Sequence, residues 1–532
     1  MSRTGSTFKQ VGVASFIMMA SVFASRIIGL AREIAIAYAG GAGAGVDAYQ
    51  VSFILPEILN HIVASGFLSI TFIPIFSSYL ARGEEEQGWK IFSLVFNTFG
   101  ALLLLFIAVS LYFAQDLVAL LAPGMVNDPA VFEKAVKMTR IIIPAQFFFF
   151  TGGLFMAVQF AKERFFIPAL APLLYNLGII AAGVALSPVI GMEGFAWGVL
   201  AGAFSGNFLL QYFGAKRVGM KLSFIMTLKH PELIRYTILT LPLMLGLTMT
   251  FSTEIFLKYF GSFLGRGSIA ALNYALRIMF ILVGLFGQAV GVASYPFMAK
   301  LAARGEMEQL NELLNKTLKY LLLVIPFSVL FMVLSQEVVL ILFQRGAFDM
   351  AATLRTAKLL PCLLAGTFAF AGQTVVVRGF YAVQNTWFPA LFGTIAVVCS
   401  LPLFYLLMSV MAARGVALAL SLSAVIQSVF LFVLWNRKTG NTGAKGVYRF
   451  FFKIVLLSAG MGAILMITAA LLRTILDPAS FPGAFAICAV TGTLFLFLFA
   501  GSGVLFKIDE ISSLLEKIRN RIVKRSSKKE TV

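Results

Sequence analysis

The chain has 532 residues, of which 60% are hydrophobic and 12% charged, and its mean hydropathy is +0.92. This composition excludes a soluble globular domain and predicts an integral membrane protein. The net charge of +19 does not indicate nucleic-acid binding, because 28 of the 42 Lys and Arg residues lie at the chain ends and in alternate connections between apolar runs. That asymmetry follows the positive-inside rule and predicts that both termini are cytoplasmic.

Apolar runs of about 20 residues, each long enough to cross a bilayer, follow one another along the chain. They lack the strict alternation of barrel strands, so we predict an all-α polytopic membrane protein with about 14 transmembrane helices. The first run, residues 11–39, is predicted to be a retained helix. It is longer than the apolar part of a signal peptide and contains the charged residues Arg26, Arg32 and Glu33. The expected centres lie near residues 25, 63, 105, 148, 178, 203, 245, 282, 328, 370, 398, 424, 461 and 493.

The first predicted helix contains Arg26, Arg32 and Glu33. An arginine at the bilayer centre costs about 2.5 to 3.5 kcal/mol, so a cavity, a partner or a function must compensate. Facing a wet cavity, the guanidinium groups would suit a pyrophosphate, whose oxygens accept paired hydrogen bonds. The alternative is a buried ion pair between Arg26 and Glu33 on one helical face. Gly29 lies between the arginines and is interpreted either as a hinge or as a point of close helix packing.

Further polar residues interrupt the later apolar runs. Asp47 follows a glycine-rich stretch and is expected to cap the next helix, and Glu254 and Lys258, one turn apart, are expected to neutralise each other. Arg277 falls within an otherwise apolar span, like the arginines of the first helix. Arg378 is expected to snorkel to the cytoplasmic interface. Three unpaired cysteines are interpreted as core-filling residues, with no disulfide or metal cluster.

The chain contains an internal duplication. Residues 81–87 match residues 303–309 at an offset of 222, and three further matches recur at 221: Gln115 with Gln336, Pro168 with Pro389, and Gly194 with Gly415. We therefore predict two six-helix lobes, residues 1–222 and 223–440, followed by two helices in 441–506 and a basic cytoplasmic tail, 507–532. An even number of helices per lobe makes the repeat parallel, as in alternating-access transporters with a cavity between two lobes.

With these motifs the sequence resembles the MurJ (MviN) family of lipid II flippases, in the multidrug/oligosaccharidyl-lipid/polysaccharide exporter superfamily. The residues that carry the resemblance are runs 25–33, 41–48, 167–172, 274–277, 342–348 and 379–382, together with Leu55-Pro56, Ser65-Gly66, Ser69, Pro74 and Asn176. It covers the first eleven predicted helices. Asn60-His61 stands where that family has two arginines, Leu276 stands where it often has Asp, and the acids of the sodium site that some members carry are missing from helix eleven and from helix seven before Glu254.

The resemblance implies a flippase of the bacterial cytoplasmic membrane that moves lipid-linked peptidoglycan precursor by alternating access. Arg26, Arg32 and Arg277 match cavity arginines, Asn60 and His61 are the other expected substrate contacts, and Asp47 would act as a charged gate. A packing or a proton-coupling role for His61 stays open. The expected partners are a polyprenyl-pyrophosphate-linked glycan, membrane lipids and cell-wall synthesis enzymes, with a monomeric chain, no nucleic acid and no cofactor.

No metal cluster, nucleophile elbow or Walker loop is found in the sequence, so no enzymatic activity is expected. The membrane potential or an ion gradient is then the expected energy source. Three alternatives remain: a flippase for another polyprenyl-pyrophosphate-linked polysaccharide, a cation-coupled multidrug exporter, and a noncatalytic scaffold for cell-wall enzymes. An exporter of cationic drugs should have an acidic cavity, whereas the first and eighth predicted helices carry arginines.

Overall fold

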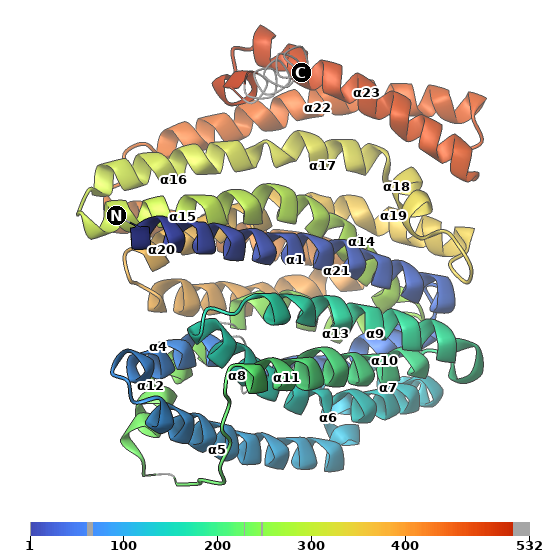
Figure 1. Cartoon of the computed structure of the whole chain (residues 1–532). Helices are drawn as coiled ribbons and strands as arrows, with labels where there is room; N and C mark the ends of the chain where they lie inside the picture. Colours follow the sequence, from blue (N-terminus) through green and yellow to red (C-terminus); the bar gives the residue numbers. More distant parts are fainter. Residues whose placement is uncertain (1, 61–66, 228, 246–247, 514–515, 517–532) are drawn as a thin grey trace, which may run out of the picture. The chain divides into compact units, whose positions relative to one another are not determined.

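The structure is a computed structural model that describes residues 2–60, 67–227, 229–245, 248–513 and 516. The regular elements of this described part are all helical (Figure 1), which confirms the all-α fold. By packing, the chain forms two compact units, Met1–Ala270 with Arg345–Asp349, and Ala271–Gln344 with Met350–Val532. The predicted division at residue 222 concerns the sequence repeat and stays a prediction.

The elements of the first unit are α1 (Ser2–Gly40), α2 (Ala44–Val51), α3 (Ile54–Leu59), α4 (Phe67–Ala81), α5 (Glu85–Tyr112), α6 (Ala114–Leu121), η2 (Pro123–Asn127), α7 (Pro129–Ile142), α8 (Ala145–Ala161), α9 (Phe166–Ile190), α10 (Glu193–Gly202), η3 (Ala203–Leu209), α11 (Leu210–Arg217), α12 (Pro231–Leu245) and α13 (Thr248–Gly261). Its core is an aromatic cluster contributed by α4, α5 and α8, in which Phe72, Phe92, Phe150 and Phe155 are fully buried. Helix α9 packs closely on both α1 and α10.

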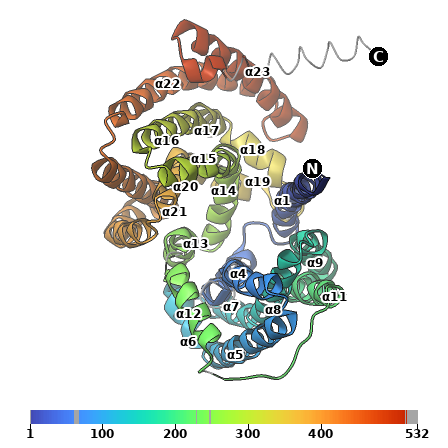
Figure 2. The same ribbon diagram turned by 60° about the vertical axis from the view of Figure 1, so that its left-hand side comes forward.

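The second unit contains η4 (Gly284–Gln288), α15 (Ala289–Ala303), α16 (Met307–Leu322), α17 (Val324–Val333), α18 (Ser335–Phe343), α19 (Met350–Leu364), α20 (Thr367–Ala382), α21 (Trp387–Thr439), α22 (Ala444–Ile475) and α23 (Phe481–Leu505), and also most of α14 (Ser268–Val283). Helices α22 and α23 lie against α16, α17 and α18 (Figure 2). Nε and Nη2 of Arg473 on α22 donate to both carboxylate oxygens of the fully buried Glu337 on α18, at 2.7 and 2.9 Å. This bidentate ion pair stabilises the packing of α22 on α18.

Within the described residues, eight helical segments are long and apolar enough to cross a membrane, and α19 with α20, bent by 44°, would form a ninth span. Thirteen of the predicted centres lie in described helices, and the one near residue 63 lies outside the described residues. Several predicted spans consist of two shorter helices in succession, such as α12 and α13. Conversely, α21 is two helices joined at Ala412. The expectation of about 14 spans is consistent with this arrangement.

The internal repeat extends to the backbone. Residues with positive φ recur 221 or 222 positions apart, where successive helices connect. The amide of Arg164 donates to the carbonyl of Gln159 at 2.8 Å, and the amide of Asn385 donates to that of Phe380 at 2.9 Å, which is the same turn in both halves. The four pairs and their φ values are Gly83 and Gly305 (77° and 73°), Glu163 and Gln384 (59° and 57°), Gly191 and Ala412 (61° and 48°), and Gly219 and Gly440 (89° and 64°).

Candidate functional site

Arg32 on α1 is held in place by two polar side chains of the first unit. Its Nη2 donates to Oε1 of Glu33 at 2.6 Å, and its Nη1 donates to Oδ1 of Asn176 on α9 at 3.0 Å. The amide of Asn176 in turn donates to the carbonyl of Pro172 at 2.8 Å, which fixes the orientation of its oxygen. The Arg32 side chain stays 23% exposed, whereas that of Glu33 is 5% exposed. A guanidinium has five N–H groups, so this arrangement orients the cation and leaves donors for an anion.

The side chain of Arg26 is exposed on α1, six residues before Arg32. Gly29 lies between them in a continuous helix, and a Cβ built at this glycine would meet no atom within 4 Å. Close helix packing therefore does not explain Gly29 in this structure. The hinge role remains a prediction.

Asp47 lies inside α2 and is 4% exposed. The expectation that it caps the helix that follows the glycine-rich stretch is wrong, because the N-cap of α2 is Gly43. Its carboxylate instead accepts hydrogen bonds from the backbone amides of Gly267 and Ala270, the second at 2.7 Å. Gly267 directly precedes α14 and Ala270 lies in its first turn, where unsatisfied N–H groups and the helix dipole both favour a negative charge.

Lys258 on α13 is 1% exposed and lies between two carboxylates of the first unit. Its Nζ is 2.9 Å from Oε2 of Glu57 on α3 and 4.0 Å from Oε2 of Glu254. The sequence pointed only to Glu254, because helical spacing reveals neighbours on one helix and not those on another. Glu57 is a lone acid in an apolar run, and this was the one sequence feature that could have indicated a second partner for Lys258.

A short segment beyond α18 packs against the end of α1 within the first unit. The amide of Ala347 donates to the carbonyl of Tyr38 at 2.8 Å. Gly41 and Gly346 both have φ of +60°, and a Cβ at Gly346 would meet the Tyr38 carbonyl oxygen at 2.5 Å. Sequence reasoning missed this contact, although both partners lie in glycine-containing runs.

The second unit contributes Arg277, which is half-buried on α14. Its neighbours Leu276 and Ile278 are fully buried, so the leucine found where acid was expected is part of the packed interior. The guanidinium of Arg378 lies against Gly291 on α15, and its Nη1 is buried. The expected position at the cytoplasmic interface stays a prediction. Asn60 is half-buried at the C-terminal end of α3, and His61 lies outside the described residues.

The comparisons with known proteins agree with this architecture. The family model described as "Lipid II flippase MurJ" matches residues 36–485. A lipid II flippase MurJ of Burkholderia cenocepacia is 28% identical over 442 residues, which are 81% of this chain and 85% of that protein. A solved structure of lipid II flippase MurJ in an inward closed conformation has a TM-score of 0.74 at 24% identity and covers 92% of this chain and 99% of its own. An inward-facing transporter of the multidrug resistance MATE family, in the MOP superfamily, has a TM-score of 0.66 at 14% identity over 78% of this chain and 94% of its own.

Proposed function

The chain belongs to the lipid II flippase MurJ family, and from this premise we propose that it moves lipid II across the cytoplasmic membrane by alternating access. The family match over residues 36–485 carries the assignment of the substrate. The repeat of backbone turns 221 or 222 residues apart supports the transport cycle, because many alternating-access transporters are built from internal repeats.

In this proposal Arg26, Arg32 and Arg277 bind the pyrophosphate of the substrate, while Asn60 and His61 contact the adjoining part of the head group. The fixed geometry of Arg32 supports this role. Glu33 and Asn176 hold its guanidinium at two points, and the remaining N–H groups can form a forked pair with phosphate oxygens. A preoriented guanidinium loses less conformational freedom on binding than a free one.

Movement of the charged head group is coupled to the membrane potential. One elementary charge moved through 100 mV is worth about 2.3 kcal/mol. A pyrophosphate that joins two groups carries two negative charges and can therefore draw on about twice this energy, and the carrier catalyses no chemical step. Gly29 serves as the bend of α1 between conformations, and Asp47 serves as a charged gate at the start of α14.

We further propose that the protein is a monomer of the bacterial cytoplasmic membrane with both termini in the cytoplasm, and that cell-wall synthesis enzymes are its functional neighbours. The multi-pass helical structure and the basic residues at the chain ends support this topology.

The test is complementation in bacteria depleted of their own lipid II flippase, with two readouts. The first is growth. The second is exposure of lipid II on the outer leaflet, measured as cleavage by an externally added enzyme that attacks the lipid-linked pyrophosphate. We expect Arg32→Ala to reduce exposure at least about tenfold, because a charged hydrogen bond to phosphate is lost. Arg32→Lys should restore it only in part, because an ammonium lacks the planar fork.

Arg217→Ala is the matched control, since this exposed arginine lies at the end of α11 and outside the apolar spans. Two separate results would contradict the proposal. A well-expressed wild-type chain that restores neither growth nor exposure argues against lipid II as the substrate, and transfer of the same genes to strains lacking a polysaccharide flippase or a drug exporter then tests the alternatives. Normal exposure with Arg32→Ala argues against the arginine site alone.

A further inference from the structure

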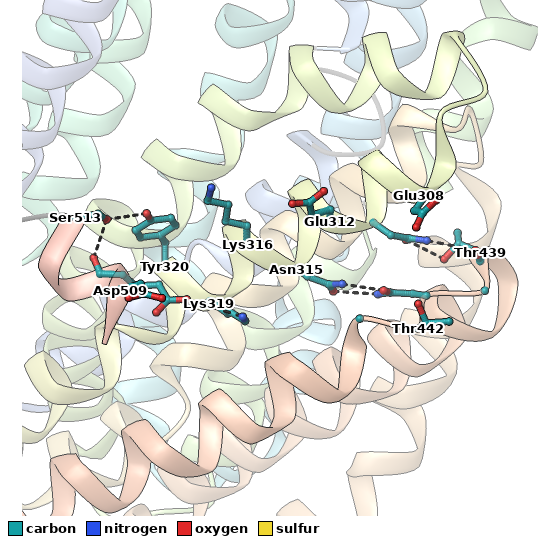
Figure 3. Close-up of a pocket in the computed structure, with 15 residues that line it drawn as sticks. Glu308, Glu312, Asn315, Lys316, Lys319, Tyr320, Thr439, Thr442, Asp509 and Ser513 are labelled. Atoms are coloured by element: carbon teal, nitrogen blue, oxygen red, sulfur yellow. Dashed lines mark hydrogen bonds and ion pairs between the residues drawn. The ribbon is translucent and has the colours of Figure 1, made fainter. Parts of the chain in front are cut away.

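The second unit contains a polar pocket that the transport cycle does not use. It has a volume of about 900 Å³ and lies along α16, against the connection between α21 and α22 and the residues that follow α23 (Figure 3). Its charged lining residues are Glu308, Glu312, Lys316, Lys319, Asp509 and Glu510. Four carboxylates against two ammonium groups give the lining a net charge of −2.

Reciprocal hydrogen bonds fix the wall of this pocket. The side-chain amides of Asn315 and Asn441 donate to each other at 2.8 and 2.9 Å, and both residues are buried. The hydroxyls of Tyr320 and Ser513 lie 2.9 Å apart and join α16 to the last described residues (Figure 3). The pocket is therefore built from packed polar groups.

The acids on α16 are poorly neutralised. Glu308 and Glu312 are exposed and have no ion pair within the described part of the chain. Lys319 is instead directed to Glu510, at 4.0 Å. The two glutamates lie one helical turn apart and face the same side of α16 (Figure 3). Their negative charges therefore repel each other.

The internal repeat shows what such a carboxylate binds when a cation is available. Glu86 of the first half corresponds to Glu308, and it forms an ion pair with the ammonium of Lys221. The position of Lys221 corresponds to Thr442 in the second half, and that of Lys90 corresponds to Glu312. The second half therefore has no lysine at position 442 and carries an additional acid at position 312. Glu308 is retained there, but the lysine that pairs with the corresponding Glu86 in the first half is absent.

We propose that this pocket binds the terminal segment of the same chain, residues 517–532, through its lysine and arginine side chains. That segment carries seven basic residues and one acid, a net charge of +6. It begins four residues after Ser513, which itself lines the pocket. The thirteen residues of α16 from Glu308 to Tyr320 span about 18 Å, and sixteen residues reach about 50 Å when extended. A tether of this length keeps the local concentration of the cations high, so individually weak ion pairs suffice.

Limited trypsin digestion of the full-length chain in an uncharged detergent tests the proposal, with intact mass used to follow cleavage within residues 517–532. The double variant Glu308→Gln, Glu312→Gln should be cleaved there about three to ten times faster than wild type, because two ion pairs are lost. About 0.5 M salt should accelerate the wild type by a similar factor. Thr442→Lys, which restores the lysine of the first half, should also release the segment.

Glu86→Gln is the matched control, because it removes the corresponding acid of the first half, which has its own lysine. It should leave the cleavage rate of the terminal segment unchanged. Equal rates for wild type, the double variant and Thr442→Lys would overturn the proposal. Protection that appears only in vesicles with anionic lipid and persists in the double variant would also overturn it and identify the membrane surface as the ligand. Thr442→Lys, at an exposed position, decides the matter should the double variant not fold.

Discussion

Ala412 has the backbone conformation of Gly191, the residue that precedes it by 221 positions. The φ and ψ angles are 48° and −126° at Ala412, and 61° and −142° at Gly191. This region is open to glycine and strained for residues with a Cβ, at about 1 to 3 kcal/mol. The same turn brings Gly415 against the backbone of Leu407. The second half therefore has the same tight turn with alanine at the position where the first half has Gly191.

We predict that Ala412→Gly stabilises the protein by about 1 kcal/mol. The relief of strain exceeds the entropy that glycine adds to the unfolded chain. Thermal unfolding in detergent measures the effect. Ala413→Gly is the control, since position 413 is helical. A glycine there should lower the stability of the protein by about 0.5 to 1 kcal/mol. Equal destabilisation by both variants would contradict the strain argument.

Gly29→Ala should leave the stability unchanged or raise it by up to about 1 kcal/mol, because the added methyl meets open space and alanine favours a helix. If α1 bends at this glycine during transport, outer-leaflet exposure of lipid II should fall by about fivefold, which corresponds to the same energy. Gly153→Ala, at another helical glycine with free space, is the control and should transport normally. Normal transport with Gly29→Ala would remove the hinge role.

Asp47→Ala should destabilise the protein by about 2 to 3 kcal/mol, since two backbone amides lose their charged acceptor. Asp47→Asn should lose about half as much, because the amide oxygen can still accept one bond. Thermal unfolding distinguishes these values. Asp116→Ala, at an exposed acid in the first turn of α6, should change the stability by less than about 0.5 kcal/mol. A transport defect with Asp47→Asn at nearly normal stability would favour the gate over the cap.

A double-mutant cycle should give a larger coupling energy between Lys258 and Glu57 than between Lys258 and Glu254, because the distances are 2.9 and 4.0 Å. Lys258→Met alone should destabilise the protein by at most about 3 to 5 kcal/mol, because the buried ammonium that pairs with both carboxylates is lost. Adding Glu57→Gln should recover part of this loss. Unfolding free energies of the single and double variants measure both couplings, and equal values would show that the shorter distance has no energetic meaning.

The ion pair of Asp128 with Arg266 should make the stability of the protein depend on pH in the acidic range. Nε of Arg266 lies 2.5 Å from Oδ2 of Asp128, and this hydrogen bond and charge lower the pKa of Asp128 below its ordinary value of 3.8. The pair therefore contributes stability above the unfolded-state pKa and loses it as the pH falls through the lower folded-state pKa.

Arg266→Gln should reduce the unfolding temperature at pH 7, and the difference from wild type should shrink as the pH is lowered toward 3. Arg217→Gln, at an exposed arginine of α11, should show no such dependence on pH. A difference between wild type and Arg266→Gln that stays constant across this range would show that the Asp128 carboxylate does not titrate through the pair.

Local chemistry and the repeat could be predicted from the sequence, whereas partners from other helices could not. The match of Gly194 with Gly415 was one of the four that indicated the duplication, and positive φ values that recur 221 or 222 residues apart agree with that repeat. The polar residues of the first span pointed to Arg32, but its contact with Asn176 depends on how α9 packs on α1. Helical periodicity carries no information on such packing.

Asp47 shows the same limit from the other side. Its position after a glycine-rich stretch fitted a cap, and it does bind N–H groups at a helix start, but those of α14, which begins 221 residues later. A capping preference describes the chemistry of the side chain and leaves the identity of the helix open. Likewise, the sequence offered Lys258 a partner one turn away, while the fold supplied the nearer one from α3.

The bidentate ion pair between Arg473 and Glu337 joins a C-terminal helix to a position that belongs to the internal repeat. The position of Glu337 corresponds to Asp116 in the first half, so a carboxylate stands at this place in both repeats. In the first half it is exposed, and in the second it is covered by the arginine of α22. One guanidinium from α22 therefore suffices to pair the C-terminal hairpin with an acidic position that both halves of the repeat share.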